Sequence, residues 1–485
     1  DRTCIGARLC CEDDGSTKSN GIVVGGPADK SGELKLNDRI VAIDSNNSGE
    51  MVDILFMKLD KVVDMIRGSE NSQIRLKVEP ADAPGQAKII TLTRSKVPLK
   101  DELAKAEINE LNGAPDGQNR IGVLRLPSFY ADMDGGDRRC AADVKKLLER
   151  MNREKVDGLV IDLRNNGGGS QEEVRLMTGF FSGRGPVVQI NDTRGNVDVK
   201  TANNREKLFK GPIVVLINKL SASASEILAA ALQDYGRAVI VGDTSTFGKG
   251  TVQQPVDIGQ YLPYFSARDR AGLLKVTTQK FYRVPGGSTQ LKGVESDIQL
   301  PTATAAFELG EEILDYAMPY DQIPPCHNYK KDSAIAGMLP ALKAASAERV
   351  EKDRDLQIAK EDIAMMKQRI KDNKLSLNKK VREQENASLE ERRKSINQER
   401  KTRFAQMAKD DAAKYKIYRL TLDDINAPEL PLANPEKDNE QFMHVAEDPT
   451  AELDDSPEYP SGLDPELREG INIVQDMLKQ QTPAK

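Results

Sequence analysis

The sequence predicts a multidomain α+β protein whose last third is helical. The chain has 485 residues, which is more than one typical domain. Residues 118–242 alternate between strand-like and helix-like segments, and residues 345–425 are dense in charged residues and contain neither Gly nor Pro. From these observations we expect three regions, spanning residues 1–96, 97–325 and 326–485.

The first region has the pattern of a small domain that mixes several strands with one clear helix. Apolar residues recur at helical spacing over residues 59–66, and Gly68 provides a stop. Short apolar or alternating runs elsewhere in the region predict strands. The strand candidates are residues 5–9, 21–24, 39–44, 74–78 and 89–93.

The second region alternates strands with helices, which is the pattern of a parallel α/β sheet. Strand candidates at residues 122–126 and 158–163 flank an amphipathic helix at residues 141–152. The glycines of residues 167–169 then form a turn before a helix at residues 172–180.

A second turn of this type follows a later apolar strand. The run at residues 212–217 leads into the string SASASE at residues 221–226, which opens a segment rich in Ala and Leu. Two such turns at the same end of a sheet form one crevice, so we expect this turn and the glycine turn to lie together.

The third region is predicted to be a charged helical arm with a short amphipathic helix near its end. Residues 345–425 favour a helix by propensity, but their apolar positions are sparse and show no sustained heptad. A solvated arm is therefore favoured over a coiled coil. Prolines then interrupt the chain, and a helix is expected over residues 467–478.

Composition argues against several classes of protein. The net charge is -6, and the two signs are mixed along most of the chain, so we expect no nucleic-acid partner. We find no run of about 18 apolar residues that could span a bilayer. The five cysteines lack paired spacing, so we expect no zinc site. We also expect no cofactor and no other metal. Because Asp1 leads almost directly into a strand, we expect that upstream sequence has been removed.

The SASASE string is a candidate for nucleophilic catalysis. A serine at a strand-to-helix turn lies near free backbone N–H groups, as nucleophilic serines do on unrelated folds. His327 and His444 lie outside this region, so lysine is the obvious base, and Lys249 occurs nearby in the string TFGKGTVQ at residues 246–253. Its ordinary pKa of about 10.4 must fall for it to act as a base. Alone, the SASASE string is more typical of a helix cap, and the triple glycine of residues 167–169 is more typical of a turn. Their combination with the Gly-Lys-Gly string around Lys249 favours an enzyme.

Two strings in the first region resemble PDZ domains. They are GGPADKSG at residues 25–32 and LNDRIVAID at residues 36–44. PDZ domains bind a chain terminus as an added strand, and backbone amides hold the terminal carboxylate. The resemblance implies that the carboxylate-binding turn includes Ile5, Gly6 and Ala7, with Cys4 in place of the usual first glycine.

Further strings resemble the carboxyl-terminal processing peptidases, most closely their tail-specific protease branch. The strings are DLRNNGGG, SASASE, QDYGRAV, TFGKGTVQ, QKFYR and GGSTQ, at residues 162–169, 221–226, 233–239, 246–253, 279–283 and 286–290. The resemblance implies a PDZ-like domain, a crotonase-like α/β serine protease core and a charged helical C-terminal region.

The same resemblance implies roles for individual residues. Ser223 would be the nucleophile, Lys249 the base, and Gln253 the residue that orients the lysine amine. The implied oxyanion donors are Gly167, Gly168 and Ala224. The implied supporting residues are Glu226, Asp234 and Thr246. This chain departs from the family pattern by one extra residue within residues 242–247 and by Ser296, where proline is common.

The function implied is that of a serine endopeptidase of the bacterial periplasm. Such enzymes process or degrade proteins with free apolar C-terminal tails, and some work with a lipoprotein adaptor. Helical regions flank both sides of the family's core, and we expect the N-terminal one to be missing here. Two alternatives stay open, a catalytically inactive tail-binding scaffold and a crotonase-like acyl-CoA enzyme. The lack of an evident adenine or phosphate site disfavours the second.

Overall fold

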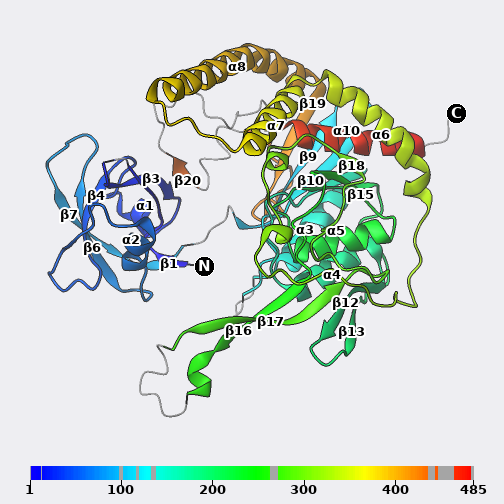
Figure 1. Ribbon diagram of the computed structural model, residues 1–485, viewed down its shortest axis with the longest axis horizontal. Helices are drawn as coiled ribbons and strands as arrows, with labels where there is room; N and C mark the ends of the chain where they lie inside the picture. Colours follow the sequence, from blue (N-terminus) through cyan, green and yellow to red (C-terminus); the bar gives the residue numbers. More distant parts are fainter. Residues whose placement is uncertain are drawn as a thin grey trace. The chain divides into compact units, whose positions relative to one another are not determined.

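A computed structural model describes residues 2–12, 14–97, 102–115, 119–132, 138–262, 271–434, 443–445 and 464–481. The chain divides into two compact units. Unit 1 comprises Asp1–Glu102 and Asn434–Glu458, and unit 2 comprises Leu103–Ala433 and Tyr459–Lys485. Figure 1 labels most of the helices and strands of the two units.

Unit 1 contains an antiparallel sheet with two short helices. The main strand order is β2-β3-β4-β6-β7, with β20 paired to β3 and β5 to β4, while β1 pairs with β8. The elements are β1 Arg2–Cys4, β2 Ala7–Cys11, β3 Thr17–Val23, α1 Pro27–Ser31, β4 Arg39–Asp44, β5 Val52–Asp53, α2 Leu59–Ile66, β6 Gln73–Glu79, β7 Lys88–Thr93, β8 Ser95–Val97 and β20 Met443–Val445.

Alternating apolar residues build the core of unit 1. Ile74, Leu76 and Val78 occupy every second position of β6 and are all buried, because successive side chains of a strand point to opposite faces. Val62 and Ile66 of α2 belong to the same core. The helix predicted over residues 59–66 is confirmed as α2.

Unit 2 is built on a mostly parallel seven-stranded sheet. Its order is β18-β15-β14-β11-β10-β9-β19, and the strands from β18 to β10 run parallel, whereas β9 and β19 are antiparallel to their neighbours. The strands are β9 Lys105–Leu111, β10 Arg120–Arg125, β11 Gly158–Asp162, β14 Ile213–Ile217, β15 Val239–Gly242, β18 Ile298–Gln299 and β19 Tyr415–Leu420.

Helices cover both faces of this sheet (Figure 1). One core contains Leu147 of α3, Phe181 of α4 and Leu228 of α5. A separate core on the opposite face contains Leu342 of α6 and Ile471 of α10. The helices are α3 Cys140–Arg153, α4 Gln171–Ser182, α5 Ala224–Asp234, α6 Ala334–Lys352 and α10 Pro465–Gln481.

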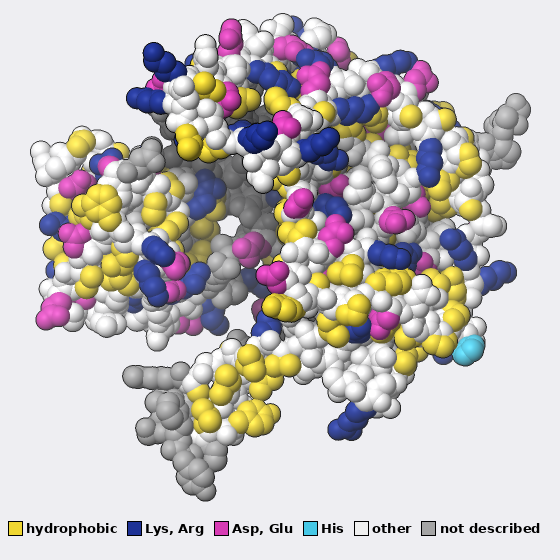
Figure 2. Space-filling model, viewed as in Figure 1, with side chains coloured by type: hydrophobic (Ala, Val, Ile, Leu, Met, Phe, Trp, Pro, Cys, Tyr) yellow, Lys and Arg dark blue, Asp and Glu magenta, His cyan; other side chains and the backbone are white. Residues whose placement is uncertain are grey.

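A second, antiparallel sheet of order β13-β12-β17-β16 extends from the helical layer (Figure 1). Its strands are β12 Gly185–Asp192, β13 Val197–Ala202, β16 Thr251–Asp257 and β17 Leu273–Tyr282. Apolar side chains gather on the projecting part of the β16–β17 hairpin, as Figure 2 shows. The exposed ones are Tyr261, Leu262, Leu273 and Leu274.

The charged region is only partly the solvated arm that we predicted. Helices α7, Arg354–Asp372, and α8, Lys379–Lys414, are largely exposed. However, Leu356 and Ile358 of α7 are buried, and the chain leaves α8 to form β19, which pairs with β9. The predicted helical and largely exposed character of residues 345–425 is therefore confirmed for α7 and α8, whereas the interpretation of the whole stretch as one solvated arm is wrong. The amphipathic helix near the end is confirmed as α10. Among the described helices, none has the length and apolar character needed to cross a bilayer.

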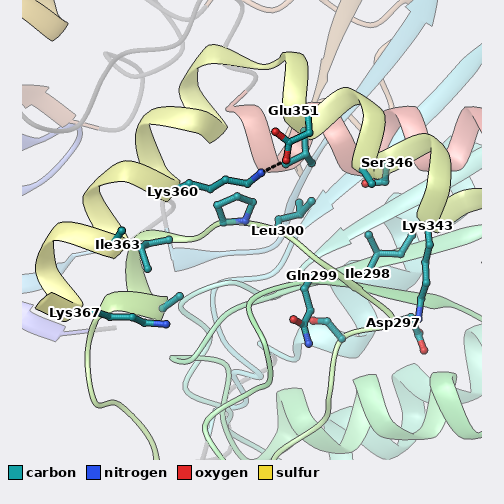
Figure 3. A pocket seen from close by; sticks show the side chains of 16 residues that line it. Asp297, Ile298, Gln299, Leu300, Lys343, Ser346, Glu351, Lys360, Ile363 and Lys367 are labelled. Carbon is teal, nitrogen blue, oxygen red and sulfur yellow. Dashed lines mark hydrogen bonds and ion pairs between the residues drawn. The ribbon is translucent and has the colours of Figure 1, made fainter. Parts of the chain in front are cut away.

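An open cavity of about 780 Å³ lies at the β18 edge of the sheet (Figure 3). Ile298, Gln299 and Leu300 contribute from the sheet side, and α6 and α7 contribute from the other. Lys360 forms an ion pair with Glu351 across the two helices. The cavity thus combines apolar walls with charges of both signs.

Replacing Gly158 by Ala should destabilise unit 2. A Cβ atom at Gly158, the first residue of β11, would lie 2.2 Å from Cγ1 of Val474 in α10. Overfilling a packed core costs about 1–3 kcal/mol, which urea unfolding would measure. Val474→Ala removes the overlapping atom, so the double variant should lose less stability than the two single variants together. Strictly additive losses would contradict this contact.

Candidate active site

Two turns that follow neighbouring strands form the candidate active site. β11 and β14 are parallel neighbours, so the turns after them lie at the same edge of the sheet. Ala222 N–H donates to Asn166 O at 3.0 Å. Asn165 N–H donates to Asn218 Oδ1 at 2.9 Å, and Asn218 Nδ2 donates back to Asn165 Oδ1 at 2.8 Å. The glycine turn and the SASASE turn therefore lie together, as the pattern of strands predicted.

Ser223 occupies the sharp bend between β14 and α5. Its φ of 56° and ψ of -109° lie where residues with side chains are rarely found. Such strain persists only where surrounding contacts impose it. Here Ser223 N–H donates to Oε2 of Glu226 at 2.8 Å, which fixes the bend.

The other two serines of the string are structural. Ser221 and Ser225 are fully buried, and their hydroxyls donate to the carbonyl oxygens of Leu163 and Asn166, each at 2.8 Å. Ser223 is partly exposed. Of the three serines, it is therefore the one that a substrate could reach.

The buried carboxylate of Glu226 joins the turn of Ser223 to the turn of Lys249. Oε1 accepts hydrogen bonds from Thr246 Oγ1 and Gly248 N–H, both at 2.7 Å. Oε2 accepts from Ser223 N–H at 2.8 Å and from Lys249 N–H at 3.0 Å. Because one oxygen binds both Ser223 N and Lys249 N, these two backbone atoms are close neighbours.

Burial also changes the acidity of Glu226. The side chain is fully buried, which raises the pKa of its carboxyl to about 7, while its four hydrogen-bond donors oppose the rise. The Thr246 hydroxyl extends the network, because it also accepts the Val294 N–H at 2.7 Å. Glu226 and Thr246 thus lie in the cluster, as the resemblance implied.

Lys249 lies on a turn that requires glycine on both sides. A Cβ atom at Gly250 would lie 2.7 Å from Gln290 N, and Gly248 has a φ of 95°. The Lys249 amine donates to Gln253 Oε1 at 3.3 Å. The structure therefore brings the predicted base and its predicted orienting residue together.

The surroundings of the Lys249 amine lower its pKa. Burial lowers its pKa, and the positive charge of Lys275 on β17 lowers it further. The carboxylates of Glu311 and Glu226 act in the opposite direction. The balance leaves the pKa below its ordinary value, as a lysine base requires.

The glycine turn lies against Ser223. A Cβ atom at Gly168 would come within 2.9 Å of Ser223 Cβ and 3.0 Å of Ala224 N. Gly168 N–H already donates to Asn166 Oδ1 at 2.9 Å. Ala224 N–H begins α5 and has no intrahelical acceptor, and no acceptor in the described ranges binds Gly167 N–H. Of the three predicted oxyanion donors, Gly167 and Ala224 are thus available, whereas the Gly168 N–H is engaged.

Asp234 lies apart from this cluster. It ends α5, whereas Ser223 precedes the helix, and each residue between them adds about 1.5 Å. Its carboxylate pairs with Arg283, with Oδ1 and Nη2 2.5 Å apart. Burial raises the pKa of Asp234, and Arg283 opposes this rise. Asp234 therefore anchors the end of β17 to α5.

The predicted carboxylate-binding turn lies between β1 and β2 of unit 1. Gly6 has a φ of 73°, and its oxygen accepts Val23 N–H at 2.8 Å. The buried Ile5 accepts Ala28 N–H at the same distance. Among the described strands, β2, which begins at Ala7, pairs only with β3. The unpaired edge of β2 is what an added peptide strand would use.

Some residues that hold the site were missed from the sequence. The fully buried Gln290 accepts Gly250 N–H at 2.8 Å and donates to Glu311 at 3.2 Å. Asn166 and Gln290 lie within strings that carry the family resemblance, and Asn218 directly follows a predicted strand. These positions in the sequence were the signals from which the supporting role of the three residues could have been predicted. Within the described ranges, no three His, Cys, Asp or Glu side chains are grouped to hold a metal ion.

Comparisons with known proteins match three parts of the chain. Residues 120–300 match peptidase family S41, residues 305–479 match the C-terminal domain of tail specific protease, and residues 19–80 match the PDZ domain. Residues 120–300 carry a peptidase family S41 domain. Its fold is a PDZ domain together with an S41 protease core, which confirms the predicted fold class.

The relatives include proteases from bacteria and algae. A tail-specific protease from Haemophilus influenzae is 38% identical over 410 residues, covering 84% of this chain and 56% of that protein. The chloroplastic C-terminal processing peptidase of Tetradesmus obliquus is 31% identical over 279 residues, covering 57% of this chain and 55% of that protein. The chain thus spans about half the length of these relatives. A solved structure of a photosystem II D1 C-terminal processing protease covers 61% of this chain and 72% of its own, with 28% identity and a TM-score of 0.36.

Ionisation of Glu226 should make the stability of the folded protein depend on pH. Its pKa is raised from 4.5 to about 7, so the folded state binds more protons than the unfolded chain between these values. The stability contributed by this group therefore falls as the pH rises through that window, by at most about 3 kcal/mol.

Urea unfolding of the wild type and of Glu226→Gln across this pH range measures the effect. The variant should lose this component of the pH dependence, so the difference in stability between wild type and variant should shrink as the pH rises. Glu206→Gln, at an exposed position, is the matched control and should follow the wild type. Parallel profiles for wild type and Glu226→Gln would rule the interpretation out.

Proposed function

We propose that this protein is a serine endopeptidase with a Ser/Lys dyad that processes or degrades proteins from their C-terminal tails. The observation that carries the proposal is the anchoring of the Ser223 and Lys249 turns on one buried carboxylate, that of Glu226. The match to peptidase family S41 and the names of the relatives support the peptidase class.

In the proposed reaction, Ser223 Oγ attacks the carbonyl carbon of the scissile peptide bond, and its proton passes to the neutral Lys249 amine. The N–H groups of Gly167 and Ala224 stabilise the oxyanion. Lys249 then gives the proton to the leaving amine as the peptide bond breaks. Water hydrolyses the acyl-enzyme with the same amine as base. Gln253 holds the amine in position throughout.

An apolar surface beside Lys249 supports an unfolded, apolar substrate. Glu311 N–H donates to Phe247 O at 2.9 Å, which holds the following segment against the turn of Lys249. Four large apolar side chains of this segment are at least 50% exposed. They are Phe307, Ile313, Leu314 and Tyr316. Extended polypeptide with apolar side chains would cover them.

Recognition of the tail is proposed for unit 1. A free C-terminus would add as a strand to β2, and its carboxylate would reach the turn formed by Ile5, Gly6 and Ala7. The PDZ match over residues 19–80 supports this part of the proposal. A periplasmic location and a lipoprotein adaptor complete it, and both rest only on the resemblance to the tail-specific protease branch.

Ser223→Ala and Lys249→Ala should each lower kcat/KM by a factor on the order of 10³ or more, because each removes a group used in bond making. Cleavage of an unfolded protein substrate, together with thermal unfolding, would check this. Lys219→Ala is the matched control, since Lys219 binds Ser245 at 2.9 Å near the same turns and should be dispensable. Cleavage that persists in Ser223→Ala would disprove the dyad, and an inert wild type would favour the scaffold.

Amidating the C-terminus of a peptide substrate should lower kcat/KM at least about tenfold, because the carboxylate loses its charge-assisted hydrogen bonds. The comparison uses two peptides of identical apolar sequence that differ only in this group. Equal cleavage of both peptides would contradict tail recognition without affecting the proposed dyad.

A further inference from the structure

A second cavity of unit 2, of about 630 Å³, lies at the end of α5 that is remote from Ser223. The ends of α4 and α5 and the segment leading into α6 form its walls. Five of its side chains are cationic and one is acidic. The cations are Arg184, Lys207, Arg237, Lys330 and Lys331, and the acid is Asp332.

The one acidic side chain of the cavity, that of Asp332, has a structural role. Asp332 Oδ1 accepts Ala334 N–H at 2.9 Å and so caps the first turn of α6. In the described part of the chain, no carboxylate forms an ion pair with any of the five cations. The nearby acid Asp234 is itself paired with Arg283. The cavity therefore carries an excess of positive charge on a chain whose net charge is -6.

Arg237 is held rigidly at the cavity. Its Nε donates to Phe181 O at 3.0 Å, and its Nη2 donates to Phe209 O at 2.9 Å. These bonds use two of the five N–H donors of a guanidinium and fix its plane. Burial lowers the pKa of Arg237 to about 10, and the charge of Arg237 together with burial lowers the pKa of Lys207. The Asp332 carboxylate opposes both shifts without reversing them, so these positive charges are only partly compensated.

The helix that starts at the cavity adds to this field. Ser333, which lines the cavity, precedes the 19-residue helix α6, whose N-terminus carries a positive partial charge. The C-terminal carbonyl groups of α4 and α5 act in the opposite direction, and Arg237 already binds one of those of α4, that of Phe181. The cavity of Figure 3 differs, because there the ion pair between Lys360 and Glu351 balances two of the charges.

We propose that this cavity binds a phosphate-bearing anion. The two oxygens of one carboxylate group are too few to contact five cationic side chains. A group with several phosphate oxygens can contact them together. A guanidinium fork matches phosphate oxygens, and lysines supply further charge. The volume falls within the range of small-ligand sites, roughly 300–1,000 Å³. The site is independent of the proposed peptidase activity, because none of its residues belongs to the Ser223 cluster.

Calorimetric titration of the full chain with pyrophosphate tests the proposal. We expect one binding site whose affinity falls as salt is added. The double variant Lys330→Ala/Lys331→Ala should weaken binding at least about tenfold, and Arg184→Ala should weaken it as well. The matched control is Lys379→Ala/Lys380→Ala, which removes the same charge from exposed lysines of α8 and should bind like the wild type.

Co-sedimentation with vesicles separates the two sources of phosphate. Binding to phosphatidylglycerol vesicles but not to phosphatidylcholine vesicles, lost in Lys330→Ala/Lys331→Ala, assigns the site to a lipid headgroup. Binding of pyrophosphate without binding of either vesicle assigns it to a free phosphate compound. The proposal is overturned if neither probe binds, or if both double variants weaken binding equally. Peptidase assays on the same variants should be unchanged, so failure here leaves the proposed function intact.

Discussion

The hydrogen bonds of the Glu226 carboxylate hold the candidate site together. A fully buried charge is costly unless donors surround it, and here three backbone N–H groups and one hydroxyl do so. These donors come from two turns that follow different strands, β14 and β15. The same bonds keep Ser223 in its unusual backbone conformation, because its N–H is one of the four donors. One side chain thus fixes the turn of Ser223 and the turn of Lys249 relative to each other.

The C-terminal part of the chain completes the fold that carries this site. α10 places Ile471 and Val474 in the core on the face of the sheet opposite α5, and β19 extends the sheet beyond β9. Arg164, just after β11, pairs with Asp464 and Glu466 at the start of α10. The residues after position 400 therefore support the strands from which the turns of the candidate site emerge.

Local patterns in the sequence predicted much of the fold and of the candidate site. The period of the apolar residues located α2 and α3. The glycine turn and the SASASE turn could be placed because each follows an apolar run that predicts a strand. β19 was missed because only Tyr415 and Leu420 of its six residues are buried and its partner β9 lies about 300 positions earlier. The supporting roles of Gln290 and Asn166 were not predicted. The hydrogen bonds of a buried amide side chain depend on which distant segments the fold places beside it, and a local pattern does not show these segments. Ser296, a departure from the family pattern, anchors the loop with a bond to Asp243 O at 2.5 Å.

Strand β20 limits how unit 1 can be isolated. Met443–Val445 pairs with β3, although the sequence of unit 2 both precedes and follows the segment that contains it. An excised fragment that ends at Glu102 would leave this edge of β3 bare around Gly21, which Met443 Sδ covers in the intact chain. Bare strand edges recruit other chains, so self-association of the fragment would come from the cut itself. Supplying the missing strand as a peptide, or fusing it to the fragment, would restore a closed edge.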